Sequence, residues 1–153
     1  TTEKLHTLRR LGVNRLSMGA QSFHSRHLQT LERLHRPAAV RTALDMARDA
    51  GIHRRSIDLI FGIPGQTLDD WKADLDAALA LETEHLSCYN LTYEPNTAMF
   101  ARLKRREFEP ADEDLEVEMY DLTLDHLAAA GLRRYEVSNY ARPGAECRHN
   151  LNY

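Results

Sequence analysis

RLSMGAQ at residues 15–21 and SIDLIF at residues 56–61 are the most informative stretches of this sequence. Both alternate apolar with polar or small residues, which is typical of β-strands. Leu16, Met18 and Ala20 form the apolar face of the first stretch. In both stretches, and in a third expected strand over residues 85–92, polar side chains stand near the C-terminal end; they are Gln21, Asp58, Asn90 and Thr92. Parallel α/β scaffolds build ligand sites at this end of their strands, so we expect such a site here.

Helices and strands are expected to alternate along the chain. The apolar spacing and capping residues predict helices over residues 2–10, 25–34, 38–50, 97–106 and 111–130, and another that starts at a Thr67 cap. Strands are expected at 13–21, 56–61, 85–92 and 135–140. This order predicts a parallel sheet with right-handed crossover connections, about half of a closed (β/α) barrel. Half a barrel leaves an unpaired strand edge, so we expect the sequence to be part of a longer chain.

Composition fits a globular α/β unit and argues against several functions. The 153 residues are 42% hydrophobic and 28% charged, with 20 basic and 23 acidic residues and a net charge of -3. The basic residues are scattered among acidic ones, so no nucleic-acid partner is expected. No apolar run approaches the roughly 20 residues that span a bilayer, and no export signal is recognisable. We therefore expect no integral membrane segment and a cytoplasmic location.

Several candidate residues have two possible roles, and the sequence does not decide between them. Asp58 stands among apolar neighbours and could accept hydrogen bonds from a ribose diol, or form an ion pair with Arg15 or Arg33 inside a barrel. Arg33 could bind a ligand carboxylate through its planar guanidinium, or pair with Glu32 or Asp45 at the surface. The loop at 62–65 lacks the pattern of a phosphate-binding loop.

The two cysteines and the C-terminal stretch carry weaker signals. Cys88 is expected to be a small core residue, and Cys88 and Cys147 are too far apart in sequence to form a recognisable metal motif. His149 lies beside Arg148 and Asn150. It could ligate haem iron or make ordinary loop hydrogen bonds.

Three longer runs resemble one known family. They are GVNRLSMGAQSF at 12–23, IDLIFGIPGQT at 57–67 and YEVSNYARPG at 135–144. These runs resemble the radical S-adenosylmethionine (SAM) proteins related to oxygen-independent coproporphyrinogen III oxidase, over essentially the whole chain. The resemblance implies a partial, TIM-like (β/α) barrel, with residues 1–107 as its C-terminal half. Residues 108–153 would form the last helix and strand unit and the start of a C-terminal extension.

The closing stretch ECRHNLNY at 146–153 looks most like the HemW-like branch of that family, the haem chaperones. The resemblance implies SAM contacts for Gln21, Arg33 and Asp58, and less directly for Thr92. It also makes His149 a candidate haem ligand. The implied partners are haem and recipient haemoproteins, with a possible homodimer in the longer protein.

The CxxxCxxC motif that holds the family's [4Fe-4S] cluster is not in this sequence. The resemblance implies SAM, a [4Fe-4S] cluster and haem as cofactors, with the cluster ligands upstream and no catalytic or metal-binding residue in this chain. The main rival is a coproporphyrinogen III oxidase, which decarboxylates propionate side chains. An aldolase-like barrel would need a Schiff-base lysine on a strand, and none of the expected strands carries one.

Overall fold

The computed structural model describes residues 1–152 and contains one five-stranded mixed sheet. The strand order is β1-β2-β3-β5-β4, with β1 and β2, and β2 and β3, parallel. The last two strands run antiparallel to their neighbours. The strands are β1 (Arg15–Gln21), β2 (Arg54–Phe61), β3 (His85–Asn90), β4 (Arg133–Glu136) and β5 (Asn139–Ala141).

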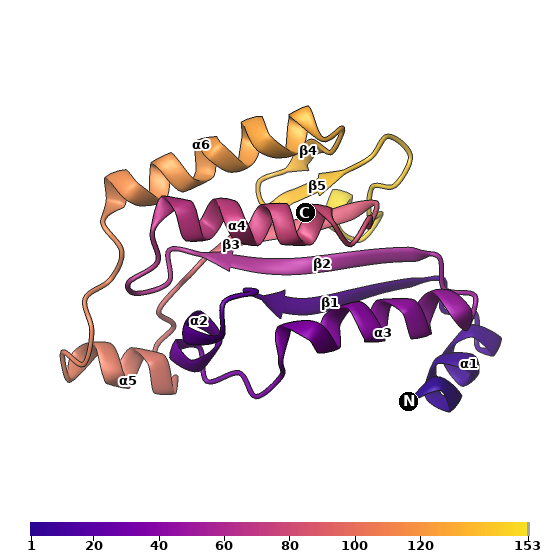
Figure 1. Cartoon of the computed structure of the whole chain (residues 1–153), viewed down its shortest axis with the longest axis horizontal. Coiled ribbons are helices and arrows are strands. Elements are labelled where there is room, and N and C mark those ends of the chain that lie inside the picture. The colour runs from indigo at the N-terminus through magenta and orange to yellow at the C-terminus, as the bar shows by residue number, and fades with distance from the viewer. Residues whose placement is uncertain (153) are drawn as a thin grey trace.

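Helices follow the parallel strands. They are α1 (Thr2–Arg10), α2 (Ser25–Thr30), α3 (Pro37–Asp49), α4 (Leu68–Leu79), α5 (Ala98–Lys104), α6 (Glu113–Ala129) and the short 3₁₀ helix η1 (Asn150–Asn152). Of these, α3, α4 and α6 pack against the sheet. Figure 1 shows α3 and α4 in front of the sheet, with α6 running beside α4. The predicted α/β fold with crossover helices and an unclosed parallel sheet is confirmed for β1 to β3.

The predicted single strand at 135–140 is wrong. The chain instead forms two short antiparallel strands, β4 and β5, joined by a turn at Val137 and Ser138. The Ser138 N–H donates to the Glu136 carboxylate at 3.1 Å, which satisfies the turn locally, and the Ser138 carbonyl accepts from the Cys88 N–H at 2.8 Å. Val137 is 67% exposed, although alternation along a single strand would bury this apolar side chain.

The sheet has one apolar and one polar face, and its register shows which residues share each. Ile57 pairs with Met18 and Leu86 on the face covered by the helices. Asp58 pairs with Gly19 and Ser87 on the other face. Fifteen buried residues form the core between the sheet and the helices: Ala20, Val40, Leu44, Ile57, Leu59, Phe61, Trp71, Leu75, Ala78, Leu86, Cys88, Met119, Leu127, Leu132 and Tyr140.

Two details of β3 differ from the expectation. Asn90 pairs with Phe61, so it belongs to the helix-covered side rather than the face of Asp58. Its amide donates to Glu116 of α6 at 2.8 Å, a contact between exposed side chains that joins the end of β3 to α6. The strand ends at Asn90, which leaves Thr92 in the following loop. Cys88 is buried in the core as predicted, and burial raises the pKa of its thiol.

Trp71 joins α4 to α6 in the core. Its side chain is fully buried, and its ring lies 5.4 Å from that of Phe61 between centroids. The indole Nε1–H donates to the Met119 carbonyl at 3.1 Å and to the Thr123 hydroxyl at 2.8 Å. Because a buried indole N–H needs an acceptor, this contact fixes the position of α6 over α4.

We predict that Trp71→Phe lowers the free energy of unfolding by about 2 kcal/mol, since it removes the indole donor and leaves a small cavity. Thermal or urea denaturation of the whole protein measures this change. Leu11→Ala is the control: Leu11 is 76% exposed, and its truncation should change stability by less than about 0.5 kcal/mol. Equal effects of the two substitutions would contradict the role given to Trp71.

Candidate functional site

A cleft of about 640 Å³ lies at the carboxyl ends of the parallel strands. Gln21, Arg33, Asp58 and Thr92 all line it, so the four residues that the sequence singled out for SAM lie together. The remaining lining residues are Ile60, Tyr89, Asn90, Leu91 and Ser138. Both apolar and hydrogen-bonding surfaces are therefore available to a ligand, as in most small-molecule sites.

Asp58 lies on the polar face of β2, near its end, and is half-buried. One carboxylate oxygen, Oδ1, accepts a hydrogen bond of 2.7 Å from the Ser17 hydroxyl of β1. Within residues 1–152 Asp58 forms no ion pair with Arg15 or Arg33, so the alternative of a barrel-interior salt bridge is not realised. The carboxylate thus keeps acceptor capacity on the side of the cleft.

Gln21 reaches the cleft through an irregularity in β1. The register between β1 and β2 shifts between Gly19 and Gln21, and Gln21 has a positive φ of 64°. Its side chain lies over Gly19, where an added Cβ would sit only 2.6 Å from Gln21 Nε2. A side chain at position 19 would therefore displace the Gln21 amide, so the glycine leaves room for it beside the cleft.

Arg33 and Thr92 come from loops. Arg33 is exposed in the segment after α2. In the part of the chain that the structure describes, its two candidate surface partners form ion pairs with other arginines. Glu32 pairs with Arg102 at 3.3 Å, and Asp45 pairs with Arg48 at 3.1 Å. The guanidinium at the rim of the cleft is therefore available to an anionic group.

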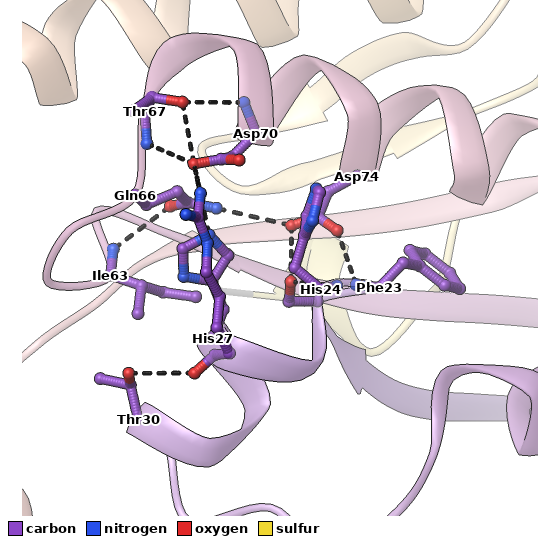
Figure 2. A network of polar contacts seen from close by, with 11 residues as sticks. Phe23, His24, His27, Thr30, Ile63, Gln66, Thr67, Asp70 and Asp74 are labelled. Atoms are coloured by element: carbon purple, nitrogen blue, oxygen red, sulfur yellow. Dashed lines mark hydrogen bonds and ion pairs between the residues drawn. The ribbon is translucent and has the colours of Figure 1, made fainter.

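A buried polar network around Asp74 of α4 holds the loops that follow β1 and β2 (Figure 2). Asp74 of α4 accepts from the Phe23 N–H at 2.6 Å and from the Ser22 hydroxyl at 2.8 Å, directly after Gln21 in the chain. The Gln66 amide N–H₂ lies 3.5 Å from Asp74, and its oxygen accepts from the Ile63 N–H at 3.2 Å. The loops after β1 and β2 are thereby tied to the same helix.

Asp74 is fully shielded from solvent, and this burial raises the pKa of its carboxyl group, although the Phe23 and Ser22 hydrogen bonds oppose the rise. Sequence reasoning missed this residue. A signal was present, because Asp74 falls on the same side of the α4 periodicity as Trp71, Leu75 and Ala78. A carboxylate on an apolar helix face needs buried donors.

The start of α4 confirms the predicted Thr67 cap. The Thr67 hydroxyl accepts from the Asp70 N–H at 3.1 Å, and Asp70 accepts from the Thr67 N–H at 2.9 Å, which makes a capping box. Asp70 also forms an ion pair with Arg26 of α2. Burial alone would raise the pKa of Asp70, but the hydrogen bonds from Thr67 and Arg26 outweigh it and lower the pKa to about 2. A charged Asp70 therefore joins α2 to α4.

His149 lies elsewhere. It lines a second cavity, of about 420 Å³, with Arg15 and Arg54 at the amino ends of β1 and β2. The structure thus brings together the four residues predicted for SAM and separates them from the residue predicted for haem. Cys147, a free thiol, lines this second cavity too.

Residues 1–152 contain no group of three or more His, Cys, Asp or Glu side chains that could hold a metal ion. In the same residues, no helix is long and apolar enough to cross a membrane.

We predict that Asp74→Ala destabilises the protein by about 2–3 kcal/mol, because the buried Ser22 hydroxyl and Phe23 N–H lose their acceptor. Asp74→Asn keeps an acceptor for Phe23 and should cost less, about 1 kcal/mol. Thermal denaturation measures both, and limited proteolysis should cut the loop after β1 faster in Asp74→Ala. Exposed Asp69 provides the matched control; if Asp69→Ala were as damaging as Asp74→Ala, the network would not be what holds these loops.

Proteins named haem chaperone HemW are similar to the whole chain. The HemW of Bacillus subtilis is 39% identical over 153 residues, which is 100% of this chain and 40% of that protein. The HemW of Escherichia coli is 40% identical over 144 residues, 94% of this chain and 37% of that protein. The chain thus spans about 40% of the length of these relatives.

A solved structure described as coproporphyrinogen III oxidase (HemN) from Escherichia coli, a radical SAM enzyme, has the same fold. It matches with a TM-score of 0.81 and 27% identity, over 94% of this chain and 33% of that one. The model of the radical SAM superfamily matches residues 1–78, just over half of the chain. Membership of this family implies SAM and a [4Fe-4S] cluster as its cofactors. The family expected from the residues is confirmed, and the chain belongs to the radical SAM superfamily.

Proposed function

We propose that this chain is the SAM-binding part of a cytosolic, HemW-like haem chaperone that binds haem and delivers it to haemoproteins. The observation that carries this proposal is the similarity of 39–40% to HemW proteins over essentially the whole chain, against 27% to the oxidase HemN. The closing residues 146–152 also favour the chaperone branch.

The residues of the cleft fit SAM chemically. The free acceptor capacity of Asp58 suits the two ribose hydroxyls, and the Arg33 guanidinium suits the methionyl carboxylate. Gln21, held over Gly19, can line the site beside the sugar, and Thr92 can close it from the loop after β3. An apolar wall of Ile60 and Leu91 gives the adenine a surface on which to lie.

The described residues do not fit a cluster, since they contain no suitable group of thiolates or other ligands. In this proposal the ligands of the [4Fe-4S] cluster come from outside residues 1–152. Such a cluster, when bound, would supply the electron that reduces SAM. The contribution of this chain is to bind SAM, to orient its sugar and carboxylate, and to keep the loops around it in place through Asp74.

An oxygen-independent coproporphyrinogen III oxidase is the second candidate, and the HemN fold supports it. The SAM cleft would serve both functions equally, because SAM binding precedes either one. What separates them is the substrate: an oxidase converts propionates, and a chaperone releases its porphyrin unchanged.

We predict that Asp58→Ala weakens SAM binding by about 100-fold, because a carboxylate that accepts two ribose hydroxyls contributes two charge-assisted hydrogen bonds. Asp58→Asn keeps the packing and one acceptor and should lose about 10-fold. Equilibrium dialysis or calorimetry with SAM and the whole protein measures both affinities. Asp121→Ala, at an exposed position of α6, is the control. Unchanged SAM affinity in Asp58→Ala would contradict the assignment.

We also predict that His149→Ala weakens haem binding by the whole protein without unfolding it, since the side chain is exposed and an axial imidazole contributes strongly to haem affinity. Titration with haem, followed at the Soret band, reports both the affinity and the change of ligand. His6→Ala, exposed on α1, is the matched control. An unchanged Soret position and affinity in His149→Ala would remove His149 from the site.

A further inference from the structure

The cavity around His149 is strongly basic. Of its seven lining residues, Arg15, Arg54 and Arg148 are cationic and only Glu146 is acidic. Arg54 and Arg148 are exposed, and neither takes part in an ion pair or side-chain hydrogen bond within residues 1–152. Two guanidinium groups without a carboxylate partner in one cavity form a site for an anion, and their planar donors match carboxylates best.

Arg15 builds this cavity rather than only lining it. Its guanidinium donates to the carbonyl oxygens of Ala145 and Glu146, 130 and 131 residues further along the chain. These bonds hold the segment with Arg148 and His149 against the amino end of β1. The presence of Arg148 in one cavity with Arg54 therefore depends on the fold and not on a chance meeting of surface side chains.

A buried chain of hydrogen bonds holds the other side of the same segment. Ser56 contacts His85 Nδ1 at 2.7 Å, and His85 Nε2 contacts the Tyr135 hydroxyl at 2.7 Å. The Tyr135 oxygen accepts from the Cys147 N–H and from the Asn150 amide, both at 3.2 Å. Burial lowers the pKa of His85 to about 4, so this histidine is neutral near pH 7 and adds no charge to the cavity.

Another cavity, beside β2, β3 and α6, has the opposite character. Glu113 and Glu116 lie on its wall with Phe61, Val117 and Tyr120, in a volume of about 430 Å³. Its apolar surface could accept a planar ring, but two carboxylates without a cation in the wall would repel anionic substituents. Charge therefore distinguishes the two cavities as sites for a ligand that carries carboxylates.

We propose that Arg54 and Arg148 bind the propionate carboxylates of haem in the cavity at the amino ends of β1 and β2, beside His149. This inference rests on the proposed haem-binding function and adds to it the part of the ligand that is recognised. Haem carries two propionates, and the two unpaired guanidinium groups provide one cation for each. The site lies at the opposite end of the strands from the SAM cleft, so both ligands can be bound at once.

The test compares haem with its dimethyl ester, which has the same ring and iron but no carboxylates. Binding of each to the whole protein is followed by absorbance titration. We expect Arg54→Ala and Arg148→Ala each to weaken haem binding by about 10-fold or more and to leave binding of the dimethyl ester unchanged. Arg10→Ala is the matched control and should change neither, because Arg10 is exposed on α1 and its only side-chain hydrogen bond within residues 1–152 is to the Thr7 hydroxyl.

Each other outcome contradicts a separate statement. If the parent protein binds haem and the two arginine substitutions do not weaken it, the propionate site is wrong while the haem-binding function stands. If both substitutions weaken haem and dimethyl ester equally, the arginines act on the fold of the segment and not on carboxylates. If the parent protein binds neither porphyrin, the proposed function itself fails, and the site with it.

Discussion

Alternation along the parallel strands, interrupted in β1 between Gly19 and Gln21, is the constraint on which the rest of this structure depends. Because successive residues of a strand face opposite sides, Ile57 enters the core under the helices, and its neighbour Asp58 must face the other way. The same alternation places Arg54, Ser56 and Asp58 on one face of β2, which is polar up to Ile60 at the end of the strand. A ligand site at each end of that face follows from this arrangement.

The two ends of the polar face are held by different means. At the carboxyl ends, Asp74 holds the loops after β1 and β2, next to Gln21 of the cleft. At the amino ends, Arg15 and Tyr135 hold the segment from 145 to 150 against the strands. In both places a buried or half-buried polar contact positions a loop, and the exposed charges remain available to ligands.

Local sequence patterns were sufficient to predict much of the fold and part of the candidate site. The alternation of β1 and β2, the Thr67 cap and the burial of Cys88 follow from spacing and residue type, and Asp58 was recognised because a carboxylate among apolar neighbours demands an explanation. The hairpin of β4 and β5 could not be foreseen, since a four-residue strand and a turn with a local Glu136 contact leave no periodicity to detect. Long-range contacts such as that between Arg15 and residue 145 have no signal in one sequence, so the basic cavity became visible only in the fold. The grouping of Arg33 with Asp58 came from the family resemblance and not from spacing.

The most direct test of the central claim uses the whole protein with its cluster reconstituted without oxygen, given SAM and coproporphyrinogen III. Mass spectrometry of the porphyrin then decides between the two members of the family that this fold serves. The account predicts that the substrate keeps its mass while the cluster remains functional. Loss of two carboxyl groups as carbon dioxide would contradict it and would make the protein an oxidase.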